Sequence, residues 1–176
     1  MNKILGTIII CLLSFDSVAQ TKEFTAMEYV GGIGNRILKV WVTDSLIFAA
    51  KVKGLTSVTT YSPLDNTQLV VSPEKRNNPD FYVDEEKSIL YSHIDFSSIT
   101  PKKFLEIDNK NFVIRKIDIL ESYHKSKKKW GMGGYTHNGR IFVISTPNEF
   151  NSKKKRELIL IGDQDEKPIL EWIKKH

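Results

Sequence analysis

The sequence is almost without cysteine: Cys11 is the only one among 176 residues. A single thiol excludes disulfides within the folded chain, and it excludes zinc sites built on several thiolates. A cysteine nucleophile in the body of the protein is excluded as well, because no cysteine follows Cys11. The stability of the fold has to come from an apolar core and from a hydrogen-bonded backbone.

Signals of enzymes are also missing. The chain has no Gly-x-Ser-x-Gly elbow of the kind that exposes a nucleophilic serine. Its four histidines form no His-x-x-x-His pair, and cysteine partners for a metal are absent. The acidic run Asp84-Glu85-Glu86 is typical of a solvated face. We therefore expect no catalytic residue, no metal and no cofactor.

Long apolar runs are missing too, apart from one near the N-terminus. Residues 1–19 contain an early lysine, an apolar stretch over residues 4–13 and the small-residue signal Ser17-Val18-Ala19, which together predict a cleaved secretory signal peptide. An apolar stretch of about ten residues is half the roughly twenty that a membrane helix needs. A lipid on Cys11 is the alternative, but Ile10 stands where a small residue is expected. The sequence predicts a periplasmic or secreted protein that is soluble after cleavage.

The net charge limits which kinds of partner are expected. The formal net charge is +5, and the mature chain keeps this excess because the one lysine and one aspartate of the leader cancel. Such a charge favours solubility and attraction to anionic surfaces, and it does not specify a fold. Nucleic acid is not expected as a partner of an exported protein.

Residues 20–176 predict a single domain. The β-rich runs 37–42 and 46–52 flank Thr43-Asp44-Ser45, which predicts a tight antiparallel hairpin. An irregular insert is predicted over residues 54–99, because glycine, proline and asparagine are frequent in its first half.

Later signals define more elements. The second half of the insert, residues 81–99, suits helix and strand equally, whereas Thr100-Pro101 predicts a capped helix that ends near residue 107. Asn138-Gly139 predicts a hairpin turn. Strands are predicted at residues 112–123, 130–136, 140–146 and 156–162.

The C-terminus predicts an amphipathic helix. Asp163 or Asp165 can cap it, and Ile169, Trp172 and Ile173 fall on one face at helical spacing. Many antiparallel strands followed by one helix indicate a mainly-β fold, either an orthogonal sandwich or a partly open barrel that this helix closes.

Two segments resemble a known family. The run Val-Trp-Val-Thr-Asp-Ser-Leu-Ile-Phe over residues 40–48 resembles the first hairpin of GRAM and bacterial pleckstrin-homology (PH) domains, and residues 157–164 followed by a helix resemble their last strand. The resemblance implies a PH-like, non-enzymatic scaffold, and such scaffolds bind lipid headgroups, peptides or proteins. PH domains that bind phosphoinositides carry basic residues on and after the first hairpin loop. Here that loop is short and acidic, so a lipid site of this kind is not reproduced.

Two basic clusters are the candidate anion-binding residues. They are Lys125, Lys127, Lys128 and Lys129, and then Lys153, Lys154, Lys155 and Arg156. Counting strands up to the Asn138-Gly139 turn and back places both clusters at one end of the sheet, with Asp163, Asp165 and Glu166 at the other. The alternative is that these side chains only decorate solvated turns.

The sequence thus predicts an exported, non-catalytic binding protein. Its expected partner is a protein or peptide, held along a sheet edge or in a groove. An anionic membrane surface or polyanion, bound through the basic clusters, is the alternative. A hydrolase is the second alternative, and it requires carboxylates and a histidine to converge in the fold.

Overall fold

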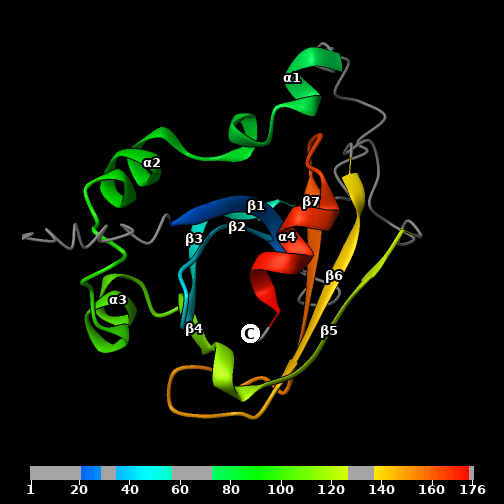
Figure 1. Ribbon diagram of the computed structural model, residues 1–176. Coiled ribbons are helices and arrows are strands. Elements are labelled where there is room, and N and C mark those ends of the chain that lie inside the picture. Colours follow the sequence, from blue (N-terminus) through cyan, green and yellow to red (C-terminus); the bar gives the residue numbers. More distant parts are fainter. Residues whose placement is uncertain (1–20, 29–34, 57–72, 127–136, 175–176) are drawn as a thin grey trace, which may run out of the picture.

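The structure, a computed structural model, describes residues 21–28, 35–56, 73–126 and 137–174. Within these ranges the chain forms a seven-stranded antiparallel sheet, curled into a half-barrel (Figure 1). Its strand order is β4-β3-β2-β1-β7-β6-β5. The strands are β1 (Lys22–Glu28), β2 (Asn35–Val42), β3 (Leu46–Thr56), β4 (Phe112–Arg115), β5 (Ile119–Lys125), β6 (His137–Ser145) and β7 (Lys155–Ile161). The predicted mainly-β, partly open barrel with a C-terminal helix is confirmed.

Short helices connect and cover the strands. They are α1 (Pro73–Asn77), η1 (Pro79–Tyr82), α2 (Glu85–Ser92), α3 (Pro101–Ile107), η2 (Lys116–Asp118) and α4 (Glu166–Ile173). The predicted caps are present: the Thr100 hydroxyl accepts a bond from the backbone N–H of Lys103, and the Asp165 carboxylate accepts one from that of Lys167. In the part of the chain that the structure describes, no helix is long and apolar enough to cross a membrane.

Alternating side chains give the sheet two apolar faces. On the concave face, residues such as Val40 and Leu158 pack with Ile169 and Ile173 of α4, so this helix fills the interior of the half-barrel (Figure 1). On the convex face, a second cluster includes Trp41, Phe48 and Ile159 of the sheet and Tyr91 and Phe104 of the helices. The helices α2 and α3 therefore cover the convex face.

The predicted insert is only partly irregular. Residues 73–77 and 79–82 are helical, and α2 shows that the ambiguous stretch contains a helix. The backbone N–H of Asp84 donates to the carbonyl of Val52, which ties the start of α2 to β3. Tertiary packing of Tyr91 against Trp41, with ring centroids 5.5 Å apart, supplies stability that the weak local pattern does not show. Residues 57–72 lie outside the described ranges.

One predicted strand is two. The stretch 112–123 breaks at η2, because the N–H of Lys116 donates to the carbonyl of Ser45 at 2.8 Å and the chain turns there. β4 and β5 consequently lie at the two edges of the half-barrel instead of continuing one line.

The predicted turn at Asn138-Gly139 is wrong, because both residues lie inside β6. Gly139 has φ +96°, and the pairing of β6 with β7 shifts its register between His137 and Arg140, as expected for a bulge. A Cβ at Gly139 would lie 2.4 Å from Nε2 of His124, so glycine is also required for close approach. The connection from β5 to β6 runs through residues 127–136, outside the described ranges, as does the predicted strand 130–136.

Candidate anion-binding site

A buried carboxylate lies at the centre of a cationic cluster. The Glu28 side chain ends β1 on the concave face and is only 2% exposed. Its Oε1 accepts bonds from Nζ of Lys153 at 2.9 Å and from Nη1 of Arg156 at 2.8 Å. Its Oε2 accepts a bond from Nε of Arg36 at 2.6 Å and also pairs with Nη2 of the same side chain. Three cations thus surround one carboxylate.

Strand pairing brings these groups together. Glu28 stands opposite Arg36 in the β1–β2 ladder and opposite Leu158 in the β1–β7 ladder. Arg156 precedes Leu158 by two residues, so its side chain points to the same concave face. Glu28, Arg36 and Arg156 therefore meet because β2, β1 and β7 lie side by side in the sheet, although β7 is far from the other two strands in sequence.

Three contacts, with Glu28, Phe112 and Asn151, hold the Arg156 guanidinium. Its Cζ lies 3.3 Å from the ring centroid of Phe112, a close cation–π contact, and its Nε donates to Oδ1 of Asn151 at 2.8 Å. Asn151 in turn donates through Nδ2 to Oγ of Ser145 at 2.9 Å and to the carbonyl of Lys153 at 3.1 Å. Arg156 is consequently fixed in orientation and only 4% exposed.

The loop that carries Lys153 is fastened to the sheet. Oδ1 of Asn148 accepts bonds from the N–H groups of Phe150 and Asn151, a local turn that asparagine favours. The carbonyl of Phe150 then accepts a bond from the N–H of Val113 on β4 at 3.1 Å. The loop therefore presents Lys153 in a defined place over Glu28.

The charges of the cluster persist at neutral pH. Burial raises the pKa of Glu28, but the charge of Arg156, the hydrogen bond from Lys153 and the charge and hydrogen bond of Arg36 lower it by more, so the net pKa lies below its ordinary 4.5. Burial lowers the pKa of Arg156 to about 10 against the opposing effect of Glu28. The carboxylate is ionised and the guanidinium is protonated.

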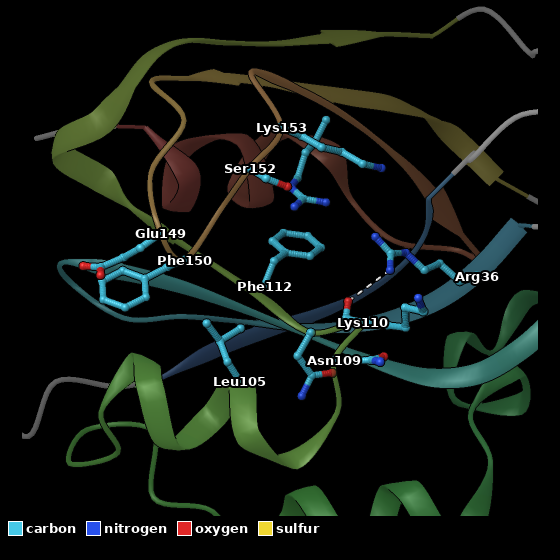
Figure 2. A pocket seen from close by; sticks show the side chains of 11 residues that line it. Arg36, Leu105, Asn109, Lys110, Phe112, Glu149, Phe150, Ser152 and Lys153 are labelled. Carbon is cyan, nitrogen blue, oxygen red and sulfur yellow. Dashed lines mark hydrogen bonds between the residues drawn. The ribbon is translucent and has the colours of Figure 1, made fainter.

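A cavity of about 280 Å³, which we call the Glu28 cavity, opens beside the cluster (Figure 2). In Figure 2, Arg36, Lys110 and Lys153 lie around Phe112, and Nη1 of Arg36 donates to the carbonyl of Lys110 at 3.0 Å. The cavity is lined by the cations Arg36, Lys110, Lys153 and Arg156, by Glu149, and by Leu105, Asn109, Asn111, Phe112, Phe150 and Ser152. Four cations against Glu149 and the buried Glu28 leave the cavity positively charged.

The structure separates the residues of the second predicted cluster. Lys153 and Arg156 belong to the Glu28 cavity, whereas Lys154 is exposed and does not line it. Lys155 points to the convex face, where its Nζ lies 4.8 Å from the ring centroid of Phe142. The four adjacent basic residues therefore lie in three different environments: the Glu28 cavity, the solvent and the convex face of the sheet.

The first predicted cluster is elsewhere. Lys125 stands opposite Arg140 near the start of β6, while Lys155 stands opposite Ile144 near its end. The prediction that both clusters share one end of the sheet is wrong, because it depended on a turn at Asn138-Gly139. Asp163 follows β7 at the Lys125 end, so the predicted separation of basic and acidic ends is wrong as well. Lys127, Lys128 and Lys129 lie outside the described ranges.

Sequence reasoning missed Glu28, Arg36 and Lys110, and it did not predict β1. The period-two pattern was available, since Phe24, Ala26 and Glu28 alternate with residues of the other face. A carboxylate that ends the apolar side of a strand signals a buried charge, which needs cationic partners.

Across residues 21–28, 35–56, 73–126 and 137–174, no three His, Cys, Asp or Glu side chains gather as a metal site. Glu121 and His124 have the spacing of a Glu-x-x-His pair, but on strand β5 that spacing places them on opposite faces. Comparisons with protein families, curated proteins and solved structures found no match to this chain.

Proposed function

We propose that this is an exported, non-catalytic binding protein that holds a carboxylate of a peptide or protein partner in the Glu28 cavity. The excess of positive charge around the cavity carries the proposal. Glu28 occupies one side of the Arg36, Lys153 and Arg156 groups, and each of these has further donors. Arginine and lysine donors beside a recess suit a side-chain or terminal carboxylate.

The shape of the site favours a peptide over a membrane. The side chains of Arg36 and Arg156 are 14% and 4% exposed, so a ligand has to enter the recess to meet them. A bilayer surface is flat and contacts protruding residues such as Lys154. An acidic side chain on a flexible segment can enter a recess of this size.

The site also favours a binding role over catalysis. A general acid or base works best with a pKa near the operating pH. Glu28 is held ionised, is almost fully buried and already accepts bonds from three cations. Glu28 is therefore suited to holding the three cations in place and not to acting as a general acid or base.

The architecture agrees with the PH-like scaffold that the sequence resemblance implies. Seven antiparallel strands curl into a half-barrel, and a C-terminal helix fills the concave side. The N–H of Val113 on the edge strand β4 already donates to the carbonyl of Phe150, so it is not open to pair with an added strand. This favours the cavity over that sheet edge as the binding surface.

The test is binding of a rhodamine-labelled peptide that alternates glutamate and serine, measured by fluorescence anisotropy at low and high salt. The matched probe carries glutamine in place of glutamate. We expect the acidic probe alone to bind, and Lys153→Met or Lys110→Met to weaken it about tenfold, the size of a lost charged hydrogen bond.

Lys154→Met is the matched control, since Lys154 adjoins Lys153 but lies outside the cavity. We expect it to change the affinity less than twofold, by roughly the effect of a surface charge. Equal binding of both probes, or equal weakening by Lys153→Met and Lys154→Met, contradicts the proposal. Sedimentation with phosphatidylglycerol vesicles, without peptide binding, would instead favour the membrane surface.

A further inference from the structure

A second cavity lies at the other end of the concave face. Glu28 is the last residue of β1, whereas Lys22 is the first, and Lys22 lines this second space of about 450 Å³. We call it the Lys116 cavity. Its lining is Lys22, Val42, Thr43, Asp44, Lys116, Pro168, Glu171 and Trp172. The helix α4 lies in the interior of the half-barrel and contributes Pro168, Glu171 and Trp172 to this lining (Figure 1).

Lys116 is the unusual residue of this cavity. It is only 7% exposed, and its backbone is fixed by the bond from its N–H to the carbonyl of Ser45. Among the residues that the structure describes, its amine has neither a hydrogen-bond partner nor an ion-pair partner. The stem of the side chain is buried, but the ammonium nitrogen keeps contact with solvent. An ammonium that is partly withdrawn from water and has no counter-ion gains from an anion that enters the cavity.

The neighbouring charges favour an anion beside Lys116. Burial lowers the pKa of Lys116, the charge of Asp44 raises it, and the charge of Lys22 lowers it again. Of the two carboxylates that line the cavity, Glu171 pairs with Lys174 and Asp44 is exposed. Two ammonium groups that repel each other are brought closer to neutrality by one anion between them.

The same cavity offers an apolar surface. The Trp172 side chain is half-buried, and Nζ of Lys22 lies 5.7 Å from its ring centroid. Val42 and Pro168 add apolar lining. Apolar walls with a few convergent polar groups are typical of small-molecule sites, which occupy about 300–1,000 Å³.

We propose that the Lys116 cavity binds a small organic acid, with its carboxylate between Lys116 and Lys22 and its apolar body against Trp172. The site is separate from the Glu28 cavity and does not depend on the function proposed for it.

The test is a thermal-shift titration of the mature protein with phenylacetate, 3-phenylpropionate and 4-phenylbutyrate. The series varies the spacing between carboxylate and ring, and the corresponding neutral amides are the matched probes. We expect at least one acid to raise the Tm in a concentration-dependent way and its amide to leave the Tm unchanged, since a ligand that binds only the folded state stabilises it.

Substitutions test whether Lys116 binds the ligand or only supports the fold. Lys116→Met is expected to be about as stable as the wild type, because methionine keeps most of the buried apolar stem, and to bind the acid about tenfold more weakly. Asp44→Asn removes a competing carboxylate and is expected to tighten binding up to about fivefold, the size of an exposed pair.

Lys154→Met and Lys153→Met are controls that we expect to retain wild-type affinity for the acid. Three results overturn the proposal: no acid of the series shifts the Tm more than its amide, Lys116→Met keeps wild-type affinity, or Lys153→Met abolishes the shift. The third result would place the acid in the Glu28 cavity.

Discussion

Replacing Glu28 by glutamine is the sharpest perturbation of the proposed peptide site. Glutamine keeps the size of the side chain and removes the only charge that three cations share. The cost differs among them. The Lys153 side chain is 39% exposed and can turn to water, whereas Arg156 is 4% exposed and cannot. The uncompensated Arg156 guanidinium therefore dominates the loss.

Removing one partner of a buried ion pair costs about 3–5 kcal/mol, a large share of the roughly 5–15 kcal/mol that stabilise a domain. For a domain of this size, 1 kcal/mol corresponds to about 2–4 °C in Tm, so we expect Glu28→Gln to lower the Tm by roughly 6–20 °C. Replacing both charges is expected to recover much of this loss, because Glu28→Gln with Arg156→Met leaves only the more exposed Arg36 and Lys153 without the carboxylate.

Urea unfolding at neutral pH measures both variants, with Glu121→Gln, an exposed glutamate on β5, as the control. A loss below about 1 kcal/mol in Glu28→Gln would refute the reasoning, since that is the size of a surface pair. A double variant no more stable than the single one would show that Arg156 is not the group left uncompensated.

Four further predictions follow from the same structure. Because the pKa of Glu28 is lowered, its stabilisation is present above its ordinary 4.5 and is lost as the pH falls below that value, so urea unfolding of Glu28→Gln is expected to depend less on pH there. Ile173→Ala, at a fully buried position of α4, is expected to lower the free energy of unfolding by about 2–5 kcal/mol. Trp172 is half-buried, so Trp172→Ala is expected to cost less than the roughly 3–5 kcal/mol of a fully buried tryptophan. Unchanged urea midpoints in both variants would contradict the packing of this helix. Gly139→Ala is expected to cost at least about 1–3 kcal/mol in urea, because alanine at φ +96° is strained and its Cβ meets His124. Mass spectrometry of the exported protein is expected to find a mature N-terminus at Gln20, and a chain that keeps Met1 would contradict export by cleavage.

Local signals predicted local structure well. The tight turn over residues 43–45, the Thr100 cap and the Asp165 cap each depend on residues within a few positions, and all three are present. The β-rich stretch 112–123 was misassigned, because the bond from Lys116 to Ser45 that breaks it joins residues far apart in sequence. Asn138-Gly139 has the composition of a turn, but in β6 the glycine serves a bulge and a close contact instead.

The candidate site was predicted in part for the same reason. The basic run 153–156 was visible in the sequence, whereas the carboxylate that selects Lys153 and Arg156 from it lies more than a hundred positions earlier. Alternation along β7 then turns Arg156, and not Lys155, to the interior. The sequence alone identifies the basic cluster, but only strand pairing shows which of its residues line the Glu28 cavity.

The two cavities differ in what a ligand can add. At the Glu28 cavity each buried cation already has a carboxylate, so a second anion gains mainly from excess charge, and we expect weak, salt-sensitive binding there. At the Lys116 cavity the ammonium of a largely buried side chain has no such partner within the described ranges, so a bound carboxylate makes the first ion pair that this group forms in the folded protein. Ligand binding and folding stability are therefore expected to be coupled more strongly at Lys116 than at Glu28. The comparison that tests this difference is the Tm shift produced by each saturating probe, the acidic peptide for one cavity and the organic acid for the other.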